Sequence, residues 1–249
     1  MPGSPLTADE QNAIHAVYKT IISQSGQFVS RRQQRALIAM VARVAAEGDI
    51  GLCEAPTAVG KSLGYLIPVM TLAALRQSRA IVTTATVVLQ DQLISRDAPR
   101  VQRAIASALS VSVPVAVLKG RSRYVCPVLL EARTAQSDLF TDPDANRDLR
   151  RLSEHLADGS WDGDLDGAPV KLARTAAREI ANDRHQCVGR ACSQHDTCPY
   201  VKAVSECRAA RVIVTNHDML LRMMETQDVA TLPPLAEATI VFDEAHHLP

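Results

Sequence analysis

The chain of 249 residues has no net charge and few aromatic side chains. Its 27 basic residues balance its 27 acidic residues, and aromatic residues make up 3% of the sequence. Overall charge therefore does not indicate a nucleic-acid partner, and any basic contact surface must be local. Few aromatic residues also argue against extensive base stacking. A hydrophobic fraction of 47% is nevertheless ample for a folded core.

Long apolar runs are missing as well. The most apolar stretch, 63–75, is interrupted by Gly64 and Pro68 and is too short to cross a bilayer. The first seven residues, Met-Pro-Gly-Ser-Pro-Leu-Thr, contain neither the basic nor the apolar segment of a signal peptide. We therefore expect a cytoplasmic protein without a membrane partner. In that compartment its six cysteines are more typical of ligands or buried thiols than of disulfides.

A phosphate-binding pattern occupies residues 53–62, Cys-Glu-Ala-Pro-Thr-Ala-Val-Gly-Lys-Ser. A short apolar stretch at 50–52, expected as a strand, precedes it, and a helical pattern follows. This order is typical of a P-loop, where backbone N–H groups and the helix dipole hold a triphosphate. Lys61 would then reach the β- and γ-phosphates, and Ser62 would bind Mg²⁺. The strict pattern begins with Gly, whereas this chain has Ala55 there.

The other half of an ATP site is expected near residue 243. An apolar, partly β-branched run, 239–242, ends in Asp243 and Glu244. A strand of this kind delivers a Mg²⁺ carboxylate and a water-activating Glu to the phosphates of a neighbouring P-loop. Together the two segments predict an ATP site in which Lys61, Asp243 and Glu244 are catalytic.

The remaining patterns predict an α/β fold. A buried strand is expected at 80–85, and further strands are expected at 114–118, 212–215 and 239–242. Helices are expected at 7–22, 30–46, from 63, at 87–94, 101–109, 199–210 and from 218. Apolar strands that alternate with helices favour a parallel sheet covered by helices.

Residues 121–198 differ from the rest because they carry no strand signals. The acidic run 162–167 resembles a Ca²⁺ loop, but it lacks the Glu that closes one, so we expect a solvated turn. We therefore divide the chain into residues 1–120, an insertion at 121–198, and a return to the first domain at 199–249.

Four cysteines in the insertion have the spacing C-x60-C-x4-C-x5-C; they are Cys126, Cys187, Cys192 and Cys198. Four thiolates can hold a [4Fe–4S] cluster. Zinc sites more often contain C-x2-C pairs, although His185 and His195 keep zinc as an alternative. Four unrelated buried cysteines are a plainer alternative, which the polar neighbours do not favour.

Taken together, these motifs resemble the DinG/XPD family of iron–sulfur superfamily 2 DNA helicases, and its DinG branch most closely. The resemblance extends from residue 28 to the end. The matching segments are 28–35 (Q motif), 54–62 (motif I), 83–93 (motif Ia), 118–127 (entry to the cluster domain), the three later cysteines, 212–217, and the DEAH box at 243–246.

The resemblance implies a RecA-like P-loop domain interrupted by a mostly helical iron–sulfur insertion. It implies ATP, Mg²⁺ and a [4Fe–4S] cluster as cofactors, and single-stranded or forked DNA as a partner of a 5′→3′ helicase. Nucleotide contacts are implied for Gln34 (adenine), Ala55, Pro56, Thr57, Ala58, Val59, Gly60, Lys61, Ser62 and His246. Mg²⁺ would be held by Ser62 and Asp243. Motif Ia and a local group of basic residues supply the candidate DNA contacts, which are Thr84, Lys119, Arg121, Arg123 and Tyr124, with Lys202 nearby. The alternative for the basic residues is that they belong to an ordinary solvated surface.

Two departures from the family pattern affect the expected activity. Ala58 stands where the family usually has Gly, which places a side chain in the loop. The sequence ends directly after the DEAH box, so we expect the second RecA-like lobe to be absent or supplied by a separate chain. Two other functions stay open: a non-motor fragment that binds ATP and DNA, and a zinc-stabilised P-loop regulator.

Overall fold

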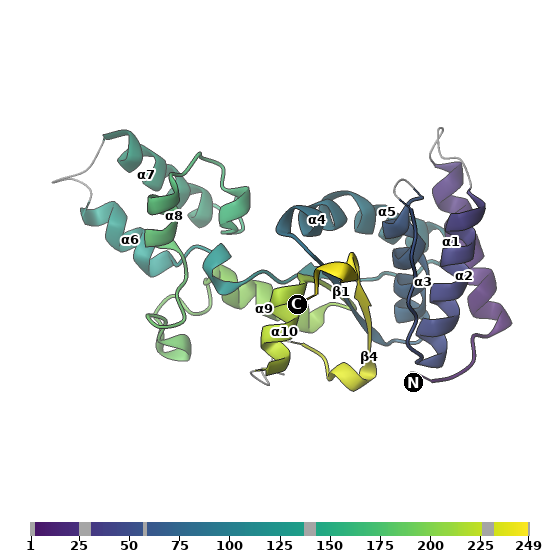
Figure 1. The fold of residues 1–249 in the computed structure, drawn as a ribbon. Coiled ribbons are helices and arrows are strands. Elements are labelled where there is room, and N and C mark those ends of the chain that lie inside the picture. Colours follow the sequence, from purple (N-terminus) through teal and green to yellow (C-terminus); the bar gives the residue numbers. More distant parts are fainter. Residues whose placement is uncertain (1–2, 25–30, 57–58, 137–142, 226–231, 249) are drawn as a thin grey trace. The chain divides into compact units, whose positions relative to one another are not determined.

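The computed structural model describes residues 3–24, 31–56, 59–136, 143–225 and 232–248 (Figure 1). The chain divides into two compact units. Unit 1 comprises residues 1–118 and 206–249, and unit 2 comprises residues 119–205. The insertion was expected at 121–198, so unit 2 begins close to the expected start and extends beyond the expected end.

Unit 1 contains a sheet of four parallel strands in the order β2-β3-β1-β4. The strands are β1 (Arg79–Thr84), β2 (Val115–Val117), β3 (Val212–Asn216) and β4 (Ala238–Phe242). Ile81 of β1 pairs in register with Ile213 on one side and Ile240 on the other. The two central strands are almost entirely buried, as expected for a parallel sheet rich in Ile and Val. The predicted α/β fold with a parallel sheet is confirmed, and it is consistent with a RecA-like domain.

The helices of unit 1 are α1 (Ala8–Ser23), α2 (Arg32–Glu47), α3 (Lys61–Leu75), α4 (Val87–Gln92), α5 (Ala98–Leu109), α10 (His217–Glu225) and the end of α9 (Pro199–Ala209). A π-helical turn, Leu93–Asp97, joins α4 to α5.

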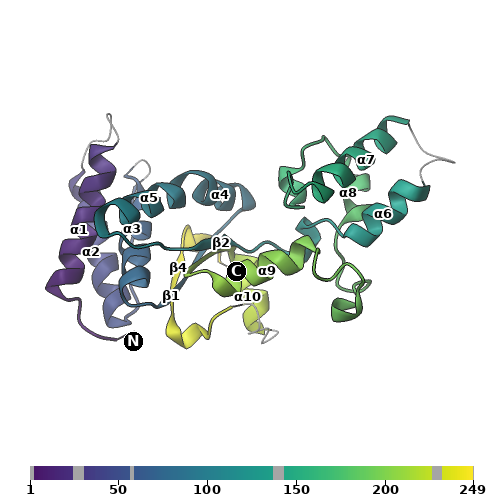
Figure 2. The same ribbon diagram turned by 180° about the vertical axis from the view of Figure 1, so that it is seen from behind.

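Helix α3 is the central helix of unit 1. It packs against α1, α2 and α5, and both views show α1, α2 and α3 side by side (Figures 1 and 2). Nearly all of its residues after Ser62 are buried, because the sequence from Leu63 is apolar on every face. The helix that follows the predicted P-loop is therefore packed against other elements on nearly every face.

The cap of α1 agrees with the sequence pattern. The Thr7 hydroxyl accepts from the N–H of Glu10, and the Glu10 carboxylate accepts from the N–H of Thr7. This reciprocal pair is a capping box, which satisfies two N–H groups that the helix leaves open. Glu10 also pairs with Arg76 at the end of α3, with 2.6 Å between Oε1 and Nε. The cap therefore joins α1 to α3.

The strand expected at 50–52 is not formed, and this prediction was wrong. Ile50 and Leu52 are fully or almost fully exposed, at 101% and 90%. A strand gains most of its stability from neighbours that pair with it and bury its side chains. An apolar stretch of three residues with Gly51 at its centre offers little surface for that purpose.

Unit 2 is mostly helical. Its helices are α6 (Pro127–Gln136), α7 (Pro143–Ala157), α8 (Arg174–Ile180) and the first part of α9. A small core lies among its elements and consists of Val125, Leu130, Leu149, Leu152, Trp161 and Ile180. Among its described residues, the β-type pairing consists of two isolated bridges, Tyr124 with Asp164 and Val125 with Ala181.

In the described part of the chain, every helix is too short or too polar to pass through a lipid bilayer.

Candidate functional site

The P-loop turn ends at Gly60, which precedes the first residue of α3. Its φ of +83° lies in the left-handed region that favours glycine. A Cβ atom there would also lie 2.3 Å from Nε2 of Gln34. Among the described residues no side chain caps α3 at Gly60, so the N–H groups of its first turn are available to a ligand. Those groups and the positive end of the helix dipole suit an anion.

Gln34 of α2 is attached to this turn. Its Nε2 donates to the carbonyl of Gly60 at 3.1 Å, and the residue is 1% exposed. Its Oε1 is buried without a hydrogen-bond partner among the residues that the structure describes. The residue that the sequence suggests for adenine recognition therefore also supports the loop.

Lys61 and Glu244 meet at this end of α3. Lys61 Nζ lies 2.5 Å from Glu244 Oε1, and both side chains are about one-third exposed. The Lys61 hydrogen bond, the Lys61 charge and the two histidines that follow lower the pKa of Glu244. Glu244 has a φ of +56°, which is uncommon for a residue other than glycine and is often found at functional sites.

Asp243 lies beside this pair and is held from two sides. Its backbone N–H donates to the carbonyl of Thr83 at 2.8 Å, and its Oδ2 accepts from the Tyr65 hydroxyl at 3.0 Å. Burial raises the pKa of Asp243 and the Glu244 charge adds to this, whereas the Tyr65 hydrogen bond and Lys61 act in the opposite direction. The structure thus brings Lys61, Asp243 and Glu244 together.

Two further residues, absent from the sequence prediction, complete this edge of the sheet. Oγ1 of Thr83 lies 2.7 Å from Nδ1 of His217 and donates to the carbonyl of Val241 at 3.3 Å. His217 is buried beside Phe242, with 5.8 Å between ring centroids. The carboxyl ends of β1, β3 and β4 are therefore connected next to Asp243.

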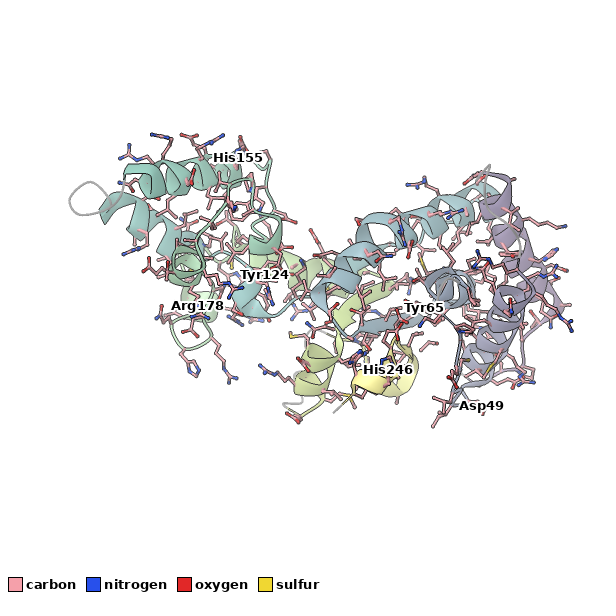
Figure 3. All side chains as sticks on the ribbon, turned by 45° about the horizontal axis from the view of Figure 1, so that its top comes forward. Asp49, Tyr65, Tyr124, His155, Arg178 and His246 are labelled. Carbon is pink, nitrogen blue, oxygen red and sulfur yellow. The ribbon has the colours of Figure 1, made fainter. Side chains whose placement is uncertain are left out.

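The other predicted nucleotide residues occupy varied environments. Val59 is buried, Ala55 is half-buried and Pro56 is exposed, while Thr57 and Ala58 lie outside the described residues. His246 is mostly exposed, and its Nδ1 lies 3.5 Å from Oε2 of Glu244. His246, which follows β4, and Tyr65, which lies on α3, are labelled in Figure 3.

The four predicted cluster cysteines are free thiols in unit 2. The Cys126 N–H donates to Ile180 O, the Cys187 N–H donates to Asp183 O, and Asn182 Nδ2 donates to Cys198 Sγ at 3.6 Å. Three of the four cysteines are thus attached to the short segment 180–183.

The thiols nevertheless do not form a closed ligand set in this conformation. Within the described ranges, no three Cys, His, Asp or Glu side chains are grouped as metal ligands. Four thiols are the right kind of ligand for an iron–sulfur cluster. The four sulfur atoms would, however, have to move closer together to hold one. The same side chains would also have to move closer together to hold zinc. His195, one of the alternative zinc ligands, has its Nδ1 3.0 Å from Asp196 Oδ1 instead.

Several predicted DNA residues are enclosed by the protein. Lys119 is 2% exposed, and its Nζ lies 2.6 Å from Asp164 and 3.2 Å from Asp166. Tyr124 and Thr84 are also buried, and the Thr84 hydroxyl donates to the carbonyl of Thr86.

The acidic turn explains the position of Lys119. The turn expected at 162–167 is solvated only in part: Asp162 and Gly167 are exposed, whereas the carboxylates of Asp164 and Asp166 both pair with Lys119. Their side chains are 17% and 23% exposed. Burial raises the pKa of Asp164, and the Lys119 hydrogen bond opposes that shift. The two carboxylates thus compensate a buried ammonium that would otherwise be unfavourable.

Arg121 and Arg123 are more accessible. The guanidinium of Arg121 lies 4.2 Å from the ring centroid of Tyr200, a cation–π contact, and Tyr200 also meets Tyr124 edge to face. The side chain of Arg123 is 48% exposed and pairs with Asp166 at 2.8 Å. Both arginines are closer to solvent than Lys119.

Comparisons with known proteins cover almost the whole chain. No family model matches it. The chain is 35% identical over 259 residues to ATP-dependent DNA helicase DinG of Salmonella typhimurium and equally to that of Escherichia coli strain K12. Each alignment includes 98% of this chain and 35% of the relative. The protein of the same name from Photobacterium profundum is 34% identical over 95% of this chain and 35% of its own length. The chain is therefore a homologue of about one-third of a DinG helicase, which confirms the resemblance that its motifs indicate.

Proposed function

We propose that this chain is the ATP- and DNA-binding portion of an ATP-dependent DNA helicase of the DinG type. The observation that carries this proposal is the meeting of Lys61 with Glu244, 183 residues apart in sequence, beside Asp243. The names of the relatives, which state an ATP-dependent DNA helicase, support it. The 5′→3′ direction and a partner chain that supplies a second lobe are parts of the proposal that rest on the family resemblance.

The geometry suggests how ATP would be bound and hydrolysed. The open N–H groups of α3 and Lys61 would hold the phosphates, while Ser62 and Asp243 would hold Mg²⁺. A bound Mg²⁺ would neutralise charge on the phosphates. Glu244 has a lowered pKa, so it is ionised at neutral pH and can accept a hydrogen bond from the attacking water. Transfer of Lys61 to the phosphate would remove the main cause of that lowering and make Glu244 a stronger base. Lys61 would exchange its pairing with Glu244 for the incoming phosphate.

Substitution of Glu244 by Gln tests this scheme. We expect the variant to lose hydrolysis but to bind ATP about two- to fivefold more tightly, because Gln does not hold the Lys61 ammonium as an ion pair. That factor corresponds to the value of a partly exposed ion pair, up to about 1 kcal/mol. Equilibrium titration with ATP and Mg²⁺ measures binding, and weaker binding by the variant would contradict the exchange of partners.

Hydrolysis with and without single-stranded DNA, with Glu244→Gln as the blank, separates the two candidate functions. DNA-stimulated hydrolysis above the blank favours a working motor site. Binding of ATP and DNA without turnover favours a non-motor module. A wild-type chain that does not bind ATP in the presence of Mg²⁺ contradicts both.

For unit 2 we propose that Cys126, Cys187, Cys192 and Cys198 hold a [4Fe–4S] cluster. The free thiols and their attachment to segment 180–183 support this assignment. The cluster would fix a unit with a small core of its own. Zinc is the alternative, and metal analysis of the purified chain distinguishes the two.

We propose Arg121 and Arg123 as phosphate contacts for single-stranded DNA. Both are more accessible than Lys119 and Tyr124, which we leave out of the proposed contacts because they are buried. Tyr200, on which Arg121 stacks, adds an aromatic face that suits a base.

Replacement of Arg123 by Ala is expected to weaken DNA binding and to reduce the slope of log affinity against log salt by about one. Titrations with labelled single-stranded DNA at several salt concentrations measure both quantities. Arg133→Ala is the matched control, because Arg133 is also a surface arginine of unit 2 paired with a carboxylate, Glu179. An unchanged salt slope in Arg123→Ala would show that Arg123 is an ordinary surface residue that does not contact DNA.

A further inference from the structure

Tyr65 contacts one of the two side chains that the proposed function assigns to Mg²⁺. Its hydroxyl donates to Asp243 Oδ2 at 3.0 Å. It lies three residues after Ser62, the other of the two, a spacing that places both on one face of α3. The phenol therefore links the amino end of α3 to the carboxyl end of β4.

The direction of this hydrogen bond follows from the chemistry of the two groups. The Tyr65 ring is 6% exposed, and a phenol keeps its proton at neutral pH. The phenol therefore donates its hydrogen to the carboxylate oxygen, which when ionised can only accept.

The carboxylate benefits from such a donor. Asp243 is half-buried and precedes Glu244, a group of the same charge. The Tyr65 hydroxyl fixes one of the two Asp243 carboxylate oxygens. Carboxylates that bind metals are commonly oriented by hydrogen bonds of this kind.

We propose that Tyr65 is a positioning residue that orients the Asp243 carboxylate for Mg²⁺ before the nucleotide binds. This inference rests on the proposed ATP site and adds to it a residue outside the recognised motifs. A tyrosine that serves packing alone would keep its role as phenylalanine, because the ring fills the same space.

The test is the Mg²⁺ dependence of ATP binding by the wild-type chain and by Tyr65→Phe. We expect the variant to need about tenfold more Mg²⁺ for half-maximal binding, the lower end of the range for outer ligand-orienting groups. Binding of ATP in EDTA is expected to be unchanged, which a general loss of structure would not produce. Tyr18→Phe, a buried tyrosine of α1 in the same unit, is the control and should leave both quantities unchanged.

A second measurement uses Asp243→Asn alone and combined with Tyr65→Phe. Because Tyr65 acts through Asp243, adding Tyr65→Phe to Asp243→Asn should raise the Mg²⁺ requirement by less than it does in the wild-type chain. An unchanged Mg²⁺ requirement in Tyr65→Phe, in a wild-type chain whose ATP binding needs Mg²⁺, would overturn the inference alone. A wild-type chain that does not bind ATP at all would overturn the proposed function with it.

Discussion

Replacement of Lys61 by Ala is expected to weaken ATP binding at least about 100-fold. A hydrogen bond to a charged group contributes about 1.5–3 kcal/mol, and the ammonium would lie close to two phosphates. The rest of the loop would be unaffected, because the turn at Gly60 is set by glycine and by Gln34. Equilibrium titration with ATP and Mg²⁺ measures the change.

A suitable control for this substitution is Lys19→Ala. Lys19 is an exposed lysine of α1 in the same unit, so its removal changes the charge equally without touching the loop. Binding that survives in Lys61→Ala would show that residues 53–62 form an ordinary turn. The ion pair with Glu244 would then be a structural contact.

The sheet of unit 1 was predictable because its strands are short, apolar and rich in β-branched residues. β1, β3 and β4 each lie within one or two residues of the expected limits. The stretch at 50–52 has a similar local composition but does not form a strand. Local pattern indicates which segments could pair, whereas pairing itself depends on neighbours that are distant in sequence.

The residues of the recognised motifs were predicted, whereas several of their hydrogen-bond partners were missed. Lys61, Asp243 and Glu244 belong to recognisable motifs, and the structure brings them together. Tyr65 was missed although its spacing from Ser62 places it on the same helical face. Thr83 and His217 were missed as a pair, because their contact joins two strands whose order in the sheet the sequence does not state.

Charge alone was misleading in unit 2. Lys119 lies in a run of basic residues and suggested a DNA contact, while the turn 162–167 suggested a solvated loop. The structure pairs one with the other across 45 residues of sequence, as shown by the 2.6 Å contact with Asp164. A local charge pattern does not reveal a partner that the fold supplies from elsewhere.

Replacement of Cys192 by Ser is expected to remove iron from the protein and to destabilise unit 2. A serine hydroxyl is a poor substitute for a thiolate, and four thiolates are the usual ligand set of a [4Fe–4S] cluster. Because the core of unit 2 is small, binding of the cluster is expected to contribute directly to its folding. Iron and zinc analysis, the brown colour expected of an iron–sulfur cluster, and thermal unfolding measure the outcome.

Cys53→Ser provides the matched control, since Cys53 is an exposed free thiol of unit 1. Its iron content should equal that of the wild type. Full iron content in Cys192→Ser would remove Cys192 from the ligand set, and zinc in place of iron in the wild type would favour the alternative metal. Loss of iron together with unchanged ATP binding by unit 1 is the expected combination, because Lys61, Asp243 and Glu244 are positioned by contacts within unit 1.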